Sequence, residues 1–154
     1  MSVYLLNNET KTKQLAEQIA HYCPENKRLI IFLNGALGAG KTTFTRFFIK
    51  ALGYPGLVKS PTYTLVETYQ LSKYRIFHLD LYRLHLPTEV LEIGLYDEFD
   101  QAAIWLIEWP ERALSFLPAP DIVCTFTRIG PHHQLMLQPQ NASSEKLLQR
   151  VANA

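Results

Sequence analysis

The chain has 154 residues, of which 47% are hydrophobic and 19% are charged, a composition typical of a globular protein and not of a disordered one. Its formal net charge of +1 gives no general affinity for nucleic acids or anionic membranes. The longest uninterrupted apolar run covers residues 102–107, far short of the roughly 20 residues that cross a bilayer. We expect one cytoplasmic domain over residues 1–154, without a membrane segment and with Cys23 and Cys124 reduced.

The first half of the chain begins with a short stretch, residues 2–6, that predicts an edge strand. A helix should follow, with Asn8 as its N-cap and its apolar side chains on one face. Residues 28–33 are a nearly continuous apolar run, which is typical of a strand buried on both faces of a parallel sheet. Residues 41–52 predict an amphipathic helix that ends at Gly53.

The second half continues with a loop and a β-branched, aromatic strand within residues 60–71, and with a buried strand over residues 74–80. A short helix should run from Pro87 to Gly94, and a third buried strand should cover residues 102–109. Two alternating segments flank Gly130 as a hairpin, and a C-terminal helix follows over residues 143–152. This alternation predicts an α/β fold with a mainly parallel sheet flanked by helices and antiparallel C-terminal strands.

The segment from Gly35 to Thr42, GALGAGKT, matches the phosphate-binding pattern G-x-x-x-x-G-K-[ST] between a predicted strand and a predicted helix. Glycines let backbone N–H groups curl around a phosphate, and the helix adds the positive end of its dipole. Lys41 should reach the β- and γ-phosphates, and the Thr42 hydroxyl should bind Mg²⁺. The pattern therefore predicts a single P-loop NTPase-type domain whose ATP-binding residues are Gly35, Leu37, Gly38, Ala39, Gly40, Lys41, Thr42 and Thr43.

Two acids end predicted buried strands and should therefore lie at the carboxyl edge of the sheet, where ligands bind. Asp80 ends the run RIFHLD, and Glu108 ends the run AIWLIE. We expect Asp80 in the shell of the metal. Glu108 should position or deprotonate water, touch the metal, or do both. Lys41, Asp80 and Glu108 are thus the candidate catalytic residues, and Thr42, Asp80 and Glu108 the candidate metal ligands.

The loop KSPTYT lies where GTPases place a segment that senses the γ-phosphate, and it predicts a switch-like loop with Ser60, Pro61, Thr62 and Thr64. Arg83 is either a contact to phosphate or a partner or an ordinary surface arginine. Trp109 packs either on the nucleotide site or only on the core. His78 shares a strand face with Asp80, so that it either hydrogen-bonds this acid or is a core histidine.

With these residues in place, the chain resembles the TsaE (YjeE) family, the ATPase subunit of bacterial tRNA threonylcarbamoyladenosine (t6A) biosynthesis. The resemblance rests on the motifs NGALGAGKTTFTRFF, SPTYT, HLDLYR and IEWP in this order. It implies a weak ATPase with ATP and Mg²⁺ as cofactors. TsaB and TsaD are the implied partners, which modify position 37 of tRNAs that read ANN codons, and hydrolysis would reset the TsaB–TsaD complex between turnovers.

The resemblance also implies that Thr12, near the start of the first helix, lies close to the nucleotide. The family has an acid where this chain has Ala36, and we expect ATP binding to survive this difference. Direct contact with tRNA stays open, because the charge of the chain does not require it.

Three other functions compete with this interpretation. A small P-loop kinase of a metabolite needs a lid and acceptor-binding arginines, whereas residues 87–100 are short, acidic and free of arginine. A GTPase needs an N-K-x-D base-reading motif, which the chain lacks. A non-hydrolysing module that only senses ATP would keep the phosphate loop without needing Glu108.

Overall fold

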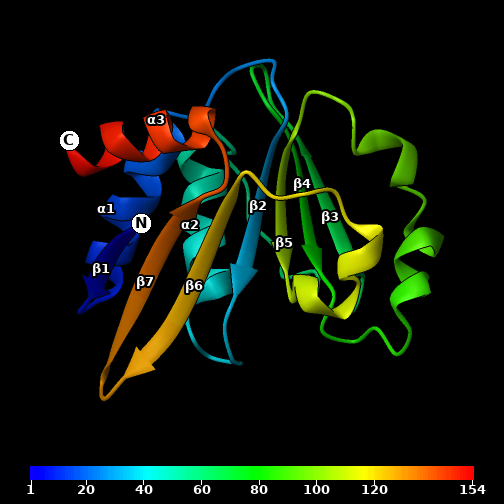
Figure 1. The fold of residues 1–154 in the computed structure, drawn as a ribbon, viewed down its shortest axis with the longest axis horizontal. Coiled ribbons are helices and arrows are strands. Elements are labelled where there is room, and N and C mark those ends of the chain that lie inside the picture. Colours follow the sequence, from blue (N-terminus) through cyan, green and yellow to red (C-terminus); the bar gives the residue numbers. More distant parts are fainter.

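A seven-stranded sheet forms the centre of the computed structural model, which describes residues 1–154 (Figure 1). The order of its strands across the sheet is β1-β7-β6-β2-β5-β4-β3. Their bounds are β1 Ser2–Leu6, β2 Leu29–Asn34, β3 Val66–Gln70, β4 Arg75–Asp80, β5 Ile104–Glu108, β6 Ile122–Ile129 and β7 His132–Pro139.

The four central strands, β6, β2, β5 and β4, run parallel. The continuous apolar sequences of β2, β4 and β5 predicted this direction, whereas β6, whose sequence alternates, was expected only as part of the antiparallel hairpin. The predicted C-terminal hairpin is confirmed: β6 and β7 pair antiparallel, and β1 adds to β7 as an edge strand. Strand β3 also pairs antiparallel with β4, an arrangement that the sequence analysis did not include. The sheet is therefore mixed, with a parallel centre and antiparallel strands on both sides.

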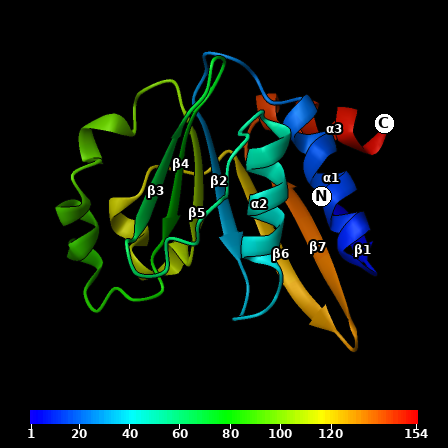
Figure 2. The same cartoon turned by 180° about the vertical axis from the view of Figure 1, so that it is seen from behind.

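Three α-helices, α1 (Glu9–His21), α2 (Lys41–Ala51) and α3 (Ala142–Ala152), pack on one side of the sheet, and α1 and α2 lie in front of it in Figure 2. Asn8 caps α1 as predicted, since its side chain accepts a hydrogen bond from the backbone N–H of Lys11. Alternate residues of the central strands, such as Ile31 and Leu33 of β2, form a core with these helices. None of the helices is long and apolar enough to cross a membrane.

Four 3-10 helices, η1 (Pro87–Ile93), η2 (Tyr96–Glu98), η3 (Pro110–Arg112) and η4 (Leu114–Phe116), lie between β4 and β6 in the sequence. Residues from this region pack on the opposite face of the sheet, around the stacked rings of Phe77 and Trp105, whose centroids are 4.1 Å apart. The predicted short helix from Pro87 to Gly94 is therefore present, with 3-10 geometry. Both faces of the central strands are thus covered, and a hollow opens at their carboxyl ends.

Candidate nucleotide-binding site

The glycine-rich loop joins the end of β2 to the start of α2. Gly40 has φ +107° directly before α2, and Gly35 has φ +147° directly after β2. A Cβ atom at Gly35 would lie 2.7 Å from the carbonyl oxygen of Phe126 on β6, which is too close for any real side chain. The loop therefore depends on glycine for its conformation and for its close approach to the neighbouring strand.

Lys41 is the first residue of α2, and its side chain is only 4% exposed. Its Nζ donates a hydrogen bond to the carbonyl oxygen of Gly35, at the beginning of the loop. The same ammonium group lies 3.8 Å from the ring centroid of Trp109. Burial lowers the pKa of Lys41, while the nearby charges of Glu108, Asp80 and Glu111 act in the opposite direction. These three acids supply the negative charge next to the buried ammonium.

The two candidate acids lie side by side, because Asp80 and Glu108 are register partners at the ends of the parallel strands β4 and β5. Both are nearly buried, at 6% and 2% exposure. Asp80 accepts hydrogen bonds from the backbone N–H of Tyr82 (3.0 Å) and, at 3.5 Å, from the hydroxyl of Thr62. Burial raises the pKa of Asp80, and the neighbouring charge of Glu108 adds to the rise. An accessible cation at this edge would relieve both effects.

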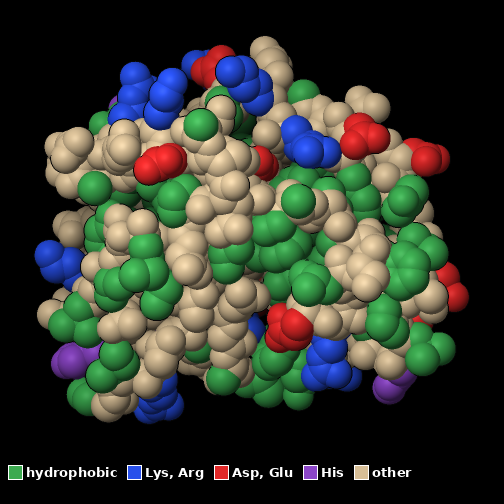
Figure 3. Space-filling model, in the orientation of Figure 1, with side chains coloured by type: hydrophobic (Ala, Val, Ile, Leu, Met, Phe, Trp, Pro, Cys, Tyr) green, Lys and Arg blue, Asp and Glu red, His purple; other side chains and the backbone are tan.

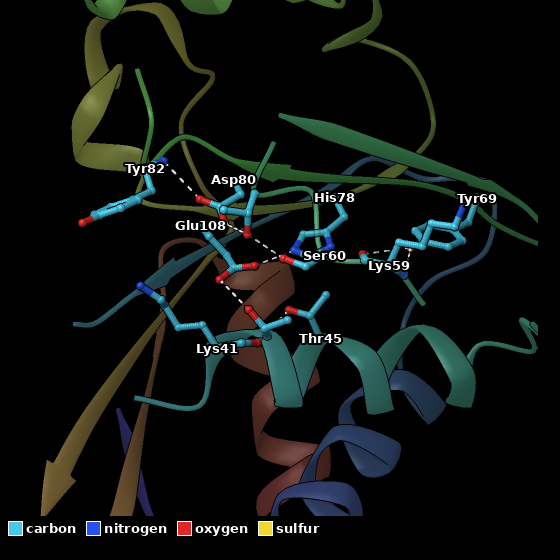
Figure 4. Close-up of polar contacts among 11 residues, drawn as sticks. Lys41, Thr45, Lys59, Ser60, Tyr69, His78, Asp80, Tyr82 and Glu108 are labelled. Carbon is cyan, nitrogen blue, oxygen red and sulfur yellow. Dashed lines mark hydrogen bonds and ion pairs between the residues drawn. The ribbon is translucent and has the colours of Figure 1, made fainter. Parts of the chain in front are cut away.

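Glu108 has a separate set of partners, drawn in Figure 4. Its Oε1 accepts a hydrogen bond of 3.3 Å from the hydroxyl of Thr42 on α2. Its Oε2 lies 2.6 Å from Nε2 of His78, which is completely buried on β4. The sequence left open whether His78 bonds Asp80 or only fills the core. The structure pairs it instead with Glu108, because β4 and β5 are adjacent and both side chains point toward α2.

A hollow of about 450 Å³ opens where the loop meets these strand ends. It brings together the following predicted residues: Leu37, Gly38, Ala39, Gly40, Lys41, Thr42, Thr43, Thr62, Asp80, Arg83, Glu108 and Trp109. Arg83 also places its guanidinium 4.3 Å from the ring centroid of Tyr63. Trp109 lies on the site side and has φ +56°, which is unusual for so bulky a residue. Such strained conformations cluster at functional sites.

Five of the predicted residues do not line this hollow: Thr12, Gly35, Ser60, Pro61 and Thr64. Thr12 is nearly buried and lines a second hollow, of about 250 Å³, on the α1 side of the loop, together with Ala39, Gly40 and Thr43. In the switch-like loop only Thr62 lines the main hollow. The hydroxyl groups of Ser60 and Thr62 share a hydrogen bond, and Pro61 lies between these two residues. The Thr64 hydroxyl donates a hydrogen bond to Glu67. The structure thus does not bring Thr64 to the site.

Two residues of the site were missed by the sequence analysis. Tyr82 lines the main hollow and supplies the backbone N–H that Asp80 accepts. His133, at the start of β7, lines both hollows, although it is far from the loop in sequence. Tyr82 stands in the motif HLDLYR, which offered a signal, whereas nothing in the local sequence around His133 indicated its position.

The oxygen donors of Thr42, Asp80 and Glu108 are of the type that Mg²⁺ prefers. The structure contains no group of three His, Cys, Asp or Glu side chains that could hold a metal by themselves. Magnesium sites of phosphate-transfer proteins commonly use one or two carboxylates and take their other ligands from substrate phosphates and water. The residues present therefore fit a magnesium ion that binds together with a nucleotide.

The fold and this loop define a P-loop NTPase-type domain. Residues 6–135 match the family model described as Threonylcarbamoyl adenosine biosynthesis protein TsaE. The chain belongs to the TsaE family.

Similar proteins span most of the chain. The protein named tRNA threonylcarbamoyladenosine biosynthesis protein TsaE from Haemophilus influenzae is 40% identical over 127 residues, which are 82% of this chain and 80% of the relative. Its namesake from Rickettsia felis is 39% identical over 145 residues, 94% and 83% of the two chains. The crystal structure of YdiB from Bacillus subtilis superimposes with a TM-score of 0.83 at 25% identity, and the match covers 99% of this chain and 94% of that one.

Proposed function

We propose that this protein binds and hydrolyses ATP with Mg²⁺ and serves tRNA threonylcarbamoyladenosine biosynthesis, the role in the names of its relatives. The observation that carries the proposal is the pair of nearly buried carboxylates, Asp80 and Glu108, opposite Lys41 and Thr42 of the loop. Two adjacent buried acids are costly without a cation. The Lys41 ammonium provides one positive charge beside the two carboxylates, and a metal ion bound with the nucleotide would balance the rest of their negative charge.

Each residue has a distinct task in the proposal. Backbone N–H groups from Leu37 to Thr43 and the Lys41 ammonium bind the phosphates, and Lys41 exchanges its bond to the Gly35 carbonyl for a phosphate oxygen. Thr42 and Asp80 hold the metal, which when bound neutralises charge on the phosphate oxygens. Glu108 orients the attacking water and accepts its proton, or also ligates the metal.

Two neighbouring elements would complete the site. Thr62 touches Asp80, so the loop around it is placed to respond to whatever occupies the metal position. Thr12 and His133 line the second hollow and lie close enough to the loop to contact the rest of the nucleotide. Arg83 and Trp109 lie at the rim of the main hollow and could meet a phosphate or a partner protein.

In the pathway, we propose that TsaB and TsaD are the partners and that hydrolysis in this cytoplasmic subunit resets their complex between rounds of synthesis. The site is open at one edge of the sheet, and such a site leaves a place for a partner to regulate turnover. A direct contact of this chain with tRNA is not part of the proposal.

Steady-state ATP turnover with Mg²⁺, measured for the protein alone and with purified TsaB–TsaD, tests the proposal. We expect slow turnover alone and a clear increase with the partners. Glu108→Ala should abolish turnover and keep nucleotide binding, whereas Glu145→Ala, at an exposed position of α3, should behave like the wild type.

Two results would contradict the proposal. Turnover that TsaB–TsaD leaves unchanged would count against the role in the pathway, and a screen for phosphate transfer to small metabolites would then test the kinase alternative. Turnover that survives Glu108→Ala would count against the assigned role of this acid and favour a module that only senses ATP.

A further inference from the structure

His78 is a buried polar residue whose surroundings leave it a single partner. Its side chain is 0% exposed, and by strand register it lies between Glu67 of β3 and Leu106 of β5. Nε2 lies 2.6 Å from Oε2 of Glu108, while Nδ1 is buried without any hydrogen-bond partner. The only polar contact of this ring is therefore to a candidate functional acid.

The direction of this hydrogen bond follows from the chemistry of the two groups. An ionised carboxylate can only accept, so Nε2 carries the hydrogen and donates it to Glu108. In the neutral ring Nδ1 is then an acceptor that no group in the structure satisfies. A buried polar atom without a partner opposes folding, and an apolar side chain here would avoid that cost. Packing alone does not explain a histidine at this position.

The contact has a clear geometric consequence for Glu108. This side chain has three rotatable bonds, and its two oxygens are held by different elements: Oε2 by β4 through His78, and Oε1 by α2 through Thr42. Figure 4 shows Glu108 between His78 and the beginning of α2. Asp80, by contrast, is held by Tyr82 and Thr62 and shares no hydrogen bond with His78. The histidine thus holds only one carboxylate of the pair by a hydrogen bond.

We propose that His78 is the positioning residue of Glu108: its Nε2–H fixes the carboxylate so that Oε1 faces Thr42 and the phosphate-binding loop. This inference rests on the proposed function, in which Glu108 serves the hydrolysis of ATP. His78 itself does not touch the nucleotide in this assignment, so its loss should affect the rate of turnover and leave nucleotide binding intact.

Substitutions of matched polarity test the inference. The amide nitrogen of glutamine can reach the position of Nε2, whereas the amide of asparagine ends closer to the backbone. We expect His78→Asn and His78→Leu to lower kcat by roughly 10- to 100-fold, as is common for residues that orient catalytic groups. The KM for ATP and the Kd for ADP, measured by calorimetry without turnover, should change less than about twofold. His78→Gln should recover much of kcat, and His21→Gln, on the exposed face of α1, should change nothing.

A double substitution separates the inference from the proposed function. In a Glu108→Gln background, His78→Asn should cause no further loss, because the group that it positions is already inactive. If His78→Gln and His78→Asn lose turnover equally, or if His78→Asn weakens ADP binding as much as turnover, the positioning role is wrong. If Glu108→Gln abolishes turnover and His78→Asn keeps it, only this inference fails. Full turnover in Glu108→Gln would overturn the inference together with the function on which it rests.

Discussion

The contacts of Lys41 show how the phosphate loop is arranged in this structure. Its ammonium bonds the Gly35 carbonyl and lies against the Trp109 ring, so the loop folds back on its own lysine. Both contacts are available to be exchanged for a phosphate, which is a stronger partner because it is charged. Loss of the Lys41 ammonium should therefore weaken the binding of a nucleotide phosphate.

Lys41→Ala should weaken ADP binding by roughly 10- to 100-fold, because a hydrogen bond to a charged group contributes about 1.5–3 kcal/mol. Calorimetric titration of ADP measures the effect. Lys50→Ala, at an exposed position of the same helix, is the control and should bind like the wild type. Equal affinity of Lys41→Ala and Lys50→Ala would show that the loop does not hold phosphate in the proposed way.

Asp80 gives a pH-dependent expectation for stability. Its pKa is raised mainly by burial, so the folded protein binds this proton more tightly than the unfolded chain does. At neutral pH the ionised carboxylate therefore opposes folding of the ligand-free protein. The penalty shrinks as the pH falls through the raised pKa of the folded state, and it is gone below the ordinary aspartate value of 3.8, where the carboxylate is protonated in both states.

Asp80→Asn should therefore raise the Tm of the ligand-free protein at pH 7 by a few degrees at most, and the gain should shrink as the pH is lowered toward the ordinary aspartate value of 3.8. Thermal unfolding across this pH range checks it, with the exposed Asp97→Asn as the control. An Asp80→Asn protein that is less stable than the wild type at pH 7 would mean that its neighbours already compensate the charge.

At the scale of the elements, the fit between the glycine-rich loop and β6 limits what residue 35 can be. Gly35 combines a positive φ with an approach of 2.7 Å between a potential Cβ and the Phe126 carbonyl oxygen, whereas Gly53 has φ +113° and open space around it. Both Gly35→Ala and Gly53→Ala carry backbone strain of about 1–3 kcal/mol. Only the first also forces β6 and the loop apart.

Gly35→Ala should lower the Tm more than Gly53→Ala and should weaken ADP binding, which Gly53→Ala should leave unchanged. Thermal unfolding and ADP titration of both variants make the comparison. A Gly35→Ala protein that matches Gly53→Ala in both respects would show that β6 yields easily and that the loop tolerates the displacement.

Much of this organisation could be predicted from local sequence. The apolar runs of β2, β4 and β5 and the GALGAGKT motif predicted a phosphate loop at the edge of a parallel centre, with Asp80 and Glu108 at strand ends. The pairing of His78 with Glu108 could not be predicted in the same way. It depends on which strands are neighbours and on where the side chains end, and period-2 alternation along β4 pointed only to Asp80.

The position of His133 and the antiparallel pairing of β3 have a similar explanation. Both result from contacts between segments distant in sequence or from the direction in which a strand joins the sheet. Thr64 illustrates the limit for loops, because a hydroxyl two residues from Thr62 turns to Glu67 and away from the site. The motifs thus predicted which residues line the site better than they predicted the hydrogen-bond partners of those residues.

At the scale of the whole molecule, the site and part of the basic surface lie at different ends of the sheet. In the face shown in Figure 3, several Lys and Arg side chains gather along the top edge, and a few more lie at the lower edge, toward which the strands β2 and β4 of Figure 1 run. The accessible end of the sheet carries the buried acids and the phosphate loop. This arrangement favours a nucleotide at the lower edge and does not require tRNA there.

The central claim is that hydrolysis at the Glu108 site renews the TsaB–TsaD complex between rounds of synthesis. Its most direct test is the time course of threonylcarbamoyladenosine formation on tRNA, reconstituted with TsaB, TsaD and either the wild-type chain or Glu108→Gln. We predict that the wild type sustains repeated rounds, while Glu108→Gln binds ATP and stops after a single round for each TsaB–TsaD complex. Repeated rounds with Glu108→Gln, at the rate of the wild type, would contradict the account.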